Sequence, residues 1–315
     1  MIPRAWFEQA FQRIAPHIRT TPLTFDPNLD IYIKWENQQV TGSFKARGAL
    51  NKVLNLQDWE RARGLVTASA GNHGQGVALA GNLTAAPVLV FASEHASLLK
   101  VTAMQSLGAE VRLVPGGYAE AEQAGIAHAA STGMTWVSPY NDGQIIAGQG
   151  TLALEMLAQQ PALADSIWVV PAGGGGLVSG IGAVLDKTNH HPRLVAVQSD
   201  ASAFLYALFH TGSQDQITEL ASLADGLAGP VEPGSVTIPL TRQFVDEFLL
   251  VNEDQVAHAI AYAWTHYQQR IEGSAAVSLA AVLNGYISTR PAVIIITGGN
   301  IQSEVFDKII GRYAE

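Results

Sequence analysis

The chain contains no cysteine, which excludes disulfide bonds, thiol catalysis and metal sites with cysteine ligands. Basic residues are also few, since 18 Lys and Arg stand against 27 Asp and Glu for a net charge of −9. Without a basic patch, nucleic acids and anionic membranes are not expected as partners. No stretch reaches the roughly 18 apolar residues that span a bilayer, and the first residues lack the apolar core of a signal peptide. We therefore expect a cytoplasmic protein that does not bind membranes.

What the chain does have is the length and apolar content of an α/β enzyme. Its 315 residues, 48% of them hydrophobic, suffice for one large or two smaller domains with a sizeable core. Short apolar runs alternate with helical patterns between residues 64 and 158, and again from residue 167 onward. Such alternation predicts parallel sheets covered by helices. Residues 225–239, where Gly and Pro recur at turn spacing, are expected to be irregular.

One lysine stands in a setting suited to covalent chemistry. Lys45 follows the turn Thr41-Gly42-Ser43 and the aromatic Phe44, and a helix is expected shortly after it, from about residue 48. An amine in such a place can lose its solvent and have its pKa lowered, which suits Schiff-base chemistry. Taken alone, the same lysine could be an ordinary solvated surface residue. The choice depends on whether other stretches are shaped to hold a cofactor.

A run of four glycines is the most specific glycine signal in the chain. It lies after a buried strand and before a helical pattern, so converging backbone N–H groups and the helix dipole would form a phosphate site. It is not a dinucleotide-binding fingerprint, because Ser179 stands where the third glycine belongs, and no Gly-Lys-Ser/Thr follows as in a Walker A loop. A tight strand-to-helix turn is the alternative, although one or two glycines usually suffice for that. The candidate phosphate-binding residues are Gly173, Gly174, Gly175, Gly176 and Leu177.

Two further stretches end strands with small polar residues. The turn of residues 69–73 connects a strand to a helix, where amides and polar side chains could hold an anion such as a carboxylate. Ordinary helix capping is the alternative. Thr297 begins a Thr-Gly-Gly-Asn sequence at the carboxyl end of a strand, where ligands bind in open α/β sheets, and its hydroxyl could donate to a ring nitrogen. The residues of the turn are Ser69, Ala70, Gly71, Asn72 and His73.

Taken in order along the chain, these stretches resemble the threonine/serine dehydratase branch of the fold-type II pyridoxal-phosphate enzymes. The resemblance rests on residues 34–37 with 41–49, residues 69–76, the tetraglycine loop and residues 297–300, and it covers nearly the whole chain. Residues 225–228 and 272–276, each beginning with a predicted turn, also resemble family segments. It implies an α/β fold like that of the tryptophan synthase β subunit, with two parallel-sheet domains and helices on both faces. The implied division is a large cofactor-binding domain of residues 1–47 plus 143–315 and a small inserted domain of residues 48–142. A homodimer or homotetramer is the implied assembly.

The resemblance also implies roles toward pyridoxal 5′-phosphate. Lys45 would carry the cofactor as a Schiff base and then remove the α-proton of an amino-acid substrate, with Phe44 beside the ring. Asn72 would contact the 3′-oxygen of the ring, and Thr297 would donate to the pyridine nitrogen. The glycine loop would hold the phosphate, and the turn from Ser69 to His73 would hold the substrate carboxylate.

The implied reaction is β-elimination of L-threonine, L-serine or both to a 2-oxo acid and ammonia. Thr297 stands where relatives usually have serine and keeps the hydroxyl. Ala70 stands where racemase relatives have a proton-donating serine, so racemisation should be weak. Gln198 and Phe204 stand in the region where some relatives have acidic metal ligands, so no divalent metal site is expected.

Several alternatives remain open at this point. Among enzymes they are a dehydratase for 3-hydroxyaspartate or another β-hydroxy amino acid, a β-replacing synthase, and a serine racemase-like enzyme. A silent ligand-binding homologue is a fourth alternative, although the lysine and the glycine loop are both retained. Because the chain ends fifteen residues after Asn300, it leaves no room for the regulatory domain of biosynthetic threonine dehydratases, and feedback control of that kind is not expected.

Overall fold

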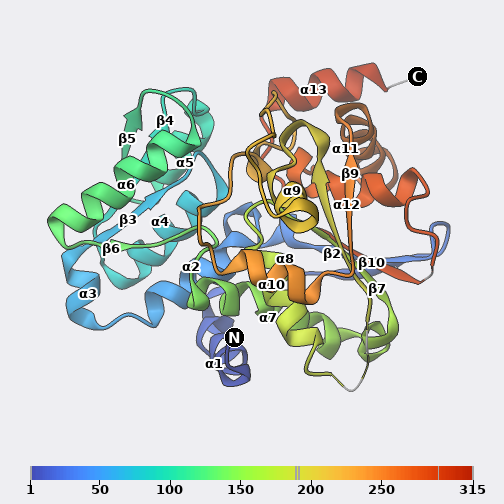
Figure 1. Ribbon diagram of the computed structural model, residues 1–315, viewed down its shortest axis with the longest axis horizontal. Coiled ribbons are helices and arrows are strands. Elements are labelled where there is room, and N and C mark those ends of the chain that lie inside the picture. Colours follow the sequence, from blue (N-terminus) through green and yellow to red (C-terminus); the bar gives the residue numbers. More distant parts are fainter. Residues whose placement is uncertain (1, 189, 191, 290, 314–315) are drawn as a thin grey trace.

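Two sheets organise the molecule (Figure 1). The structure is a computed structural model that describes residues 2–188, 190, 192–289 and 291–313. Over these residues one sheet has six strands in the order β1-β2-β10-β7-β8-β9, and the other has four in the order β5-β4-β3-β6. The segment that carries the four-stranded sheet, residues 65–136, is called the smaller lobe, and the rest of the chain is called the larger lobe. The expected α/β architecture with two parallel sheets is confirmed, with one exception at an edge.

The six-stranded sheet is parallel except at β1, which pairs with β2 in the antiparallel sense. Alternate residues of a strand face opposite sides of a sheet, and both sides here are buried. Ile294 packs in the cluster formed with α11, α12 and α13, while its neighbours Val293 and Ile295 pack with α7 and α8. The strands are β1 (Leu23–Asp26), β2 (Ile31–Trp35), β7 (Ile167–Pro171), β8 (Leu194–Ser199), β9 (Glu247–Val251) and β10 (Ala292–Ile296).

The four-stranded sheet is parallel throughout. Val88 and Val90 pack with α2, α4 and α5 on one face, whereas Leu89 and Phe91 pack with α6 on the other. Its strands are β3 (Leu65–Ala68), β4 (Val88–Ser93), β5 (Glu110–Val114) and β6 (Thr135–Trp136). The helices are α1 (Arg4–Ile14), α2 (Lys45–Leu54), α3 (Asp58–Arg63), α4 (Asn72–Thr84), α5 (Leu98–Ser106), α6 (Tyr118–Thr132), α7 (Gly143–Gln159), α8 (Gly176–Leu185), α9 (Phe204–Thr211), α10 (Thr237–Phe244), α11 (Glu253–Tyr267), α12 (Gly273–Leu283) and α13 (Ser303–Arg312).

Two expectations about local structure were wrong. Helix α2 begins at Lys45 itself and not near residue 48, because Gly48 lies inside the helix and packs against Gln149 of α7. Residues 225–239 are not irregular throughout, since the short 3₁₀ turn Asp225–Leu227 and the start of α10 fall within them. Pro239 does not prevent α10 because it is the third residue of the helix, where no intrahelical hydrogen bond is lost.

Helix α2 joins the two lobes, since it packs against α4 of the smaller lobe and α7 of the larger one (Figure 1). The domain boundaries expected from the sequence stay a prediction. None of the helices in the described ranges is long and apolar enough to cross a membrane.

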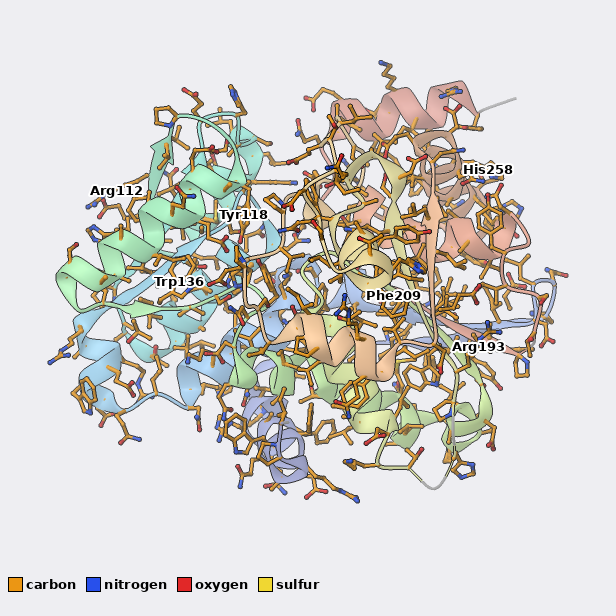
Figure 2. The ribbon with its side chains drawn as sticks, in the orientation of Figure 1. Arg112, Tyr118, Trp136, Arg193, Phe209 and His258 are labelled. Carbon is orange, nitrogen blue, oxygen red and sulfur yellow. The ribbon has the colours of Figure 1, made fainter. Side chains whose placement is uncertain are left out.

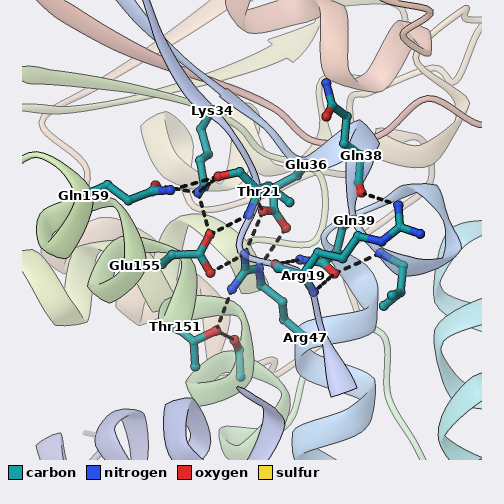
Figure 3. Close-up of polar contacts among 12 residues, drawn as sticks. Arg19, Thr21, Lys34, Glu36, Gln38, Gln39, Arg47, Thr151, Glu155 and Gln159 are labelled. Atoms are coloured by element: carbon teal, nitrogen blue, oxygen red, sulfur yellow. Dashed lines mark hydrogen bonds and ion pairs between the residues drawn. The ribbon is translucent and has the colours of Figure 1, made fainter. Parts of the chain in front are cut away.

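A buried charge network anchors α2 (Figure 3). The Arg47 guanidinium donates to both carboxylate oxygens of Glu36, at 2.7 and 2.8 Å, and to Glu155 of α7 at 2.9 Å. Lys34 of β2 pairs with the other oxygen of Glu155, and Thr21 donates to Glu36. Burial alone would raise the pKa of Glu36, but Arg47 holds that pKa below its usual value. Two positive and two negative side chains thus fix the first turns of α2 against β2 and α7.

Candidate active site

Lys45 opens α2 at a point tied to the end of β10. The Phe44 amide donates to the Thr297 carbonyl at 3.0 Å, and Ser43 forms an antiparallel bridge with Gly298. Gly42 has a φ of +72°, and a Cβ there would lie 2.6 Å from a side-chain oxygen of Asn300. Glycine is therefore required where the lysine loop meets the strand end. The first and last of the motifs found in the sequence are adjacent in space.

The Lys45 amine lies in a setting that favours its neutral form. Its Nζ donates to the Pro139 carbonyl at 3.1 Å and lies 5.4 Å from the centre of the Phe44 ring. Burial lowers the pKa of Lys45 to about 8, although the carboxylate of Glu272 opposes the shift. A desolvated lysine with a lowered pKa is a nucleophile near neutral pH. This bears on the choice left open above, because Lys45 is not an ordinary solvated lysine.

Asn72 joins the lysine loop to a carboxylate that the sequence did not single out as functional. Its Nδ2 donates to Glu272 Oε1 at 2.7 Å, and its Oδ1 accepts from Asn300 Nδ2 at 2.7 Å. Asn300 Nδ2 also donates to the Thr41 carbonyl at 2.8 Å. One hydrogen-bonded chain therefore links residues 41, 72, 272 and 300. No second acceptor for the Asn72 Nδ2 group is found in the described part of the chain, so its other proton could serve a ligand.

Glu272 is buried at the start of α12, next to this chain of hydrogen bonds. Burial raises its pKa to about 7, and the like charge of Asp225 adds to the shift. Lys100, Asn72 and the Asn300 amide act in the opposite direction. The sequence had placed Glu272 only in a turn that resembles a family segment. With a pKa of about 7 for Glu272 and about 8 for Lys45, the site has two groups that titrate close to physiological pH.

Glu272→Gln should change how stability depends on pH. The ordinary pKa of the carboxyl is 4.5 and the folded value is about 7, so between these values the folded protein holds a proton that the unfolded chain releases. The stabilisation from the neutral carboxyl is complete below the ordinary pKa and is lost as the pH rises through about 7. Melting temperatures of the cofactor-free proteins should therefore fall more steeply with rising pH in this window for wild type than for Glu272→Gln. Parallel curves would show that Glu272 ionises normally.

The turn of residues 69–73 leaves amides free at the start of α4. Gly71 is the N-cap of α4 and has no side chain to satisfy the helix, so the first N–H groups lack intrahelical partners. Ser69 Oγ accepts from the Gly71 amide at 3.0 Å, and Ala70 is exposed. Lys100 of α5 lies beside the turn, because a Cβ on Gly71 would be 3.6 Å from its Nζ. Free amides and a nearby ammonium form a setting for a carboxylate.

His73 is not suited to acid–base catalysis near neutral pH. Its Nε2 lies 3.1 Å from the Val137 carbonyl, and its Nδ1 has no partner among the described residues. Burial and the positive charge of Lys45 lower the pKa of His73 to about 3. The imidazole is therefore neutral at physiological pH, and a carbonyl at Nε2 fixes the ring proton there.

Residues 139 and 140 lie between the glycine loop and Lys45 and contact both. A Cβ on Gly174 would lie 2.4 Å from the Tyr140 ring, and Tyr140 directly follows Pro139, whose carbonyl accepts from Lys45. Gly175 has a φ of +84° and forms the N-cap of α8 without a side chain. The first amides of α8, which include Leu177, thus lack intrahelical acceptors and suit a phosphate.

The two lobes also meet through polar side chains. Lys100 of the smaller lobe pairs with Asp225 of the larger lobe. Tyr118, at the start of α6, lies toward the larger lobe (Figure 2) and donates to Glu122 at 2.7 Å. Burial raises the pKa of Glu122, and Glu232 of the larger lobe raises it further. Two charge pairs therefore span the two lobes: Lys100 and Asp225 attract each other, and Glu122 and Glu232 repel each other.

All the stretches proposed from the sequence are thus gathered around Lys45, and sequence reasoning missed several of their neighbours. Lys100 and Tyr140 gave no signal, whereas Glu272 and Asp225 were seen only as parts of turns. The donor set fits pyridoxal phosphate: an amine of lowered pKa, free helix amides for a phosphate, and amide and hydroxyl groups at the strand ends. Among the described residues no group of three or more acidic or histidine side chains could hold a metal.

Comparisons with known proteins agree with this donor set. The sequence model of the family described as pyridoxal-phosphate dependent enzyme matches residues 14–298. The chain is 40% identical over 284 residues to an L-threonine ammonia-lyase from Thermotoga maritima, a match that covers 90% of this chain and 70% of that protein. A solved structure of a threonine deaminase from T.th. is 33% identical with a TM-score of 0.85, covering 95% of this chain and 98% of that one. Maize serine racemase is 28% identical with a TM-score of 0.87, covering 98% and 97% of the two chains.

Proposed function

Because the chain belongs to the family of pyridoxal-phosphate-dependent enzymes, we propose that it is a threonine/serine ammonia-lyase, which converts L-threonine, L-serine or both to a 2-oxo acid and ammonia. Membership confirms the expected fold-type II architecture and the cofactor. The Lys45 amine, with its lowered pKa and its hydrogen bond to the Pro139 carbonyl, carries the proposal for the chemistry. The name of the 40% identical relative supports the choice of threonine.

Each part of the site has a proposed role toward the cofactor. Lys45 would bind its aldehyde, with Phe44 beside the ring. Asn72 would donate to the 3′-oxygen through its free Nδ2 proton, and the Thr297 hydroxyl would donate to the pyridine nitrogen. The amides from Gly173 to Leu177 would hold the phosphate. Once bound, pyridoxal phosphate supplies an electron sink for the α-carbon of an amino acid.

The reaction proposed for these residues is a proton transfer on one face of the substrate. The amides and side chains from Ser69 to His73, with Lys100 nearby, would hold the substrate carboxylate and orient the α-carbon. The Lys45 Nζ would take the α-proton, for which a pKa of about 8 is well matched. Ala70 offers no proton donor, and His73 is buried in its neutral form. Elimination of the β-hydroxyl is therefore favoured over return of a proton to the other face.

A substrate series tests the proposal against its alternatives. We expect 2-oxo acid and ammonia from L-threonine and L-serine, with little D-serine by chiral chromatography. A faster reaction with 3-hydroxyaspartate would reassign the substrate, and product formation only with an added thiol would indicate a β-replacing synthase. Dominant D-serine formation would favour the racemase alternative, which the likeness to maize serine racemase keeps under test.

Cofactor loading should depend on pH through Lys45. Only the free amine attacks an aldehyde, and the pKa of that amine is lowered from 10.5 to about 8. The loading rate of the cofactor-free protein should therefore rise as the pH approaches 8 and level off above it. Stopped-flow absorbance across this range measures the rate. A rate that continues to rise toward pH 10.5, as for an exposed lysine, would contradict the assignment.

Assembly and location belong to the same proposal. A homodimer or homotetramer is proposed from the resemblance to the family, and light scattering of the purified protein tests it. A cytoplasmic location is part of the same proposal, and fractionation of expressing cells tests it.

A further inference from the structure

Helix α10 packs against the outer side of the glycine loop. A Cβ on Gly175 would lie 3.0 Å both from the Cβ of Thr237 and from the Oγ1 of Thr241, two residues of α10. The Thr237 Oγ1 donates to the Gly174 carbonyl at 2.7 Å, and Ser235 Oγ lies 2.8 Å from the same hydroxyl. Thr237 and Thr241 are both buried. Only Thr237, however, forms a hydrogen bond with the loop.

This bond fixes the direction of a loop amide. A peptide unit is planar and trans, so its C=O and the N–H of the next residue point to opposite sides. With the Gly174 carbonyl held toward α10, the Gly175 N–H must point away from α10. Four consecutive glycines would otherwise give this loop wide conformational freedom. Thr237 therefore removes freedom at the peptide on which the direction of the amide depends.

We propose that Thr237 is a positioning residue for the cofactor phosphate, acting through the Gly174 carbonyl to hold the Gly175 amide toward the bound anion. The inference rests on the proposed cofactor role of the loop. It concerns affinity and not the chemical step, because Thr237 is buried and its hydroxyl contacts the Gly174 carbonyl and Ser235.

Two ligands separate the phosphate from the aldehyde. Cofactor-free protein is titrated with pyridoxal phosphate and with pyridoxal, which lacks only the phosphate, and tryptophan fluorescence gives each dissociation constant. Thr237→Val keeps the shape and removes the hydroxyl, so it should weaken pyridoxal phosphate binding by about tenfold, the usual worth of one hydrogen bond. Binding of pyridoxal should not change. Thr237→Ser should restore the affinity.

Thr241→Val is the matched control, because it removes a buried hydroxyl of the same helix that has no hydrogen-bond partner among the described residues. It should leave both dissociation constants unchanged. If Thr237→Val is too unstable to titrate, Thr237→Ala and Thr237→Ser, which differ only in the hydroxyl, give the same comparison. The inference would be overturned if the proteins with and without the hydroxyl at position 237 bound pyridoxal phosphate equally well. It would also be overturned if loss of the hydroxyl weakened the binding of both ligands equally. A wild type that binds neither ligand would instead refute the proposed function.

Discussion

Lys45→Ala should fold, bind pyridoxal phosphate without developing its visible absorbance, and lose at least about 10²–10⁴-fold in kcat, the usual worth of a positioned acid–base group. The substitution removes the Lys45 amine, whose pKa burial lowers to about 8. This amine donates to the Pro139 carbonyl at 3.1 Å. Lys100, the other ammonium near the site, is engaged with Asp225 and cannot replace it. Absorbance spectra and 2-oxo acid release measure the two effects.

Lys52 provides a matched control on the same helix. Its ammonium pairs with Asp142 at 2.6 Å, and Lys52→Ala should keep both the colour and the turnover. Lys45→Arg should fail like Lys45→Ala, because a guanidinium retains the charge but does not act as a nucleophile near neutral pH. The role given to Lys45 would be wrong if Lys45→Ala retained the absorbance and released 2-oxo acid at the wild-type rate.

The parts of the site that the sequence predicted are those whose chemistry is local. The glycine loop, the turn of residues 69–73 and Thr297 each follow a strand, and carboxyl ends of parallel strands form the ligand-binding edge of an open sheet. A strand, a turn and a helix start can be recognised within about ten residues, because hydrophobic spacing and turn residues define them. The structure brings these segments together near Lys45, and their roles are proposals.

The parts that the sequence missed depend on long-range contacts. Asn72 and Glu272 are 200 residues apart in the chain and 2.7 Å apart in space. Nothing near Glu272 in the sequence shows that it is buried, and its pKa depends on Asp225, Lys100 and Asn300, which come from three other segments. Tyr140 likewise gains its place only because Gly174 has no side chain and allows the ring to approach.

The same reasoning explains the errors in the fold. Helix α10 follows turns rich in Gly and Pro, and its helical state depends on packing against α8 and α9 more than on its own propensity. Strand β1 has only four residues and is antiparallel at the sheet edge, so it departs from the repeating strand–helix order on which the prediction relied. Tertiary packing decides both cases.

Arg47→Ala should produce a large loss of stability. It leaves Glu36 and Glu155 buried with only Lys34 as a cation, since Arg47 is fully buried and contacts both carboxylates. Removing one partner of a buried pair typically costs about 3–5 kcal/mol, because the remaining charge stays desolvated. Denaturant unfolding should therefore show a much lower midpoint than for wild type. Arg47→Lys should fall between the two, because it restores a charge but not the two-pronged contact with Glu36.

The exposed pair Arg312–Asp254 separates burial from charge as the cause. Both side chains are more than half exposed, at 59% and 74%, and Arg312→Ala should cost only about 0–1 kcal/mol. Equal effects of the two substitutions would show that the buried network contributes no more than a surface pair.

Arg47 follows Lys45 by two residues on α2, so the loss of Arg47 should also change the position of the Lys45 amine. A rise in the pH at which cofactor loading levels off, measured on Arg47→Lys, would connect the network to the amine, whereas an unchanged pH would limit Arg47 to stability.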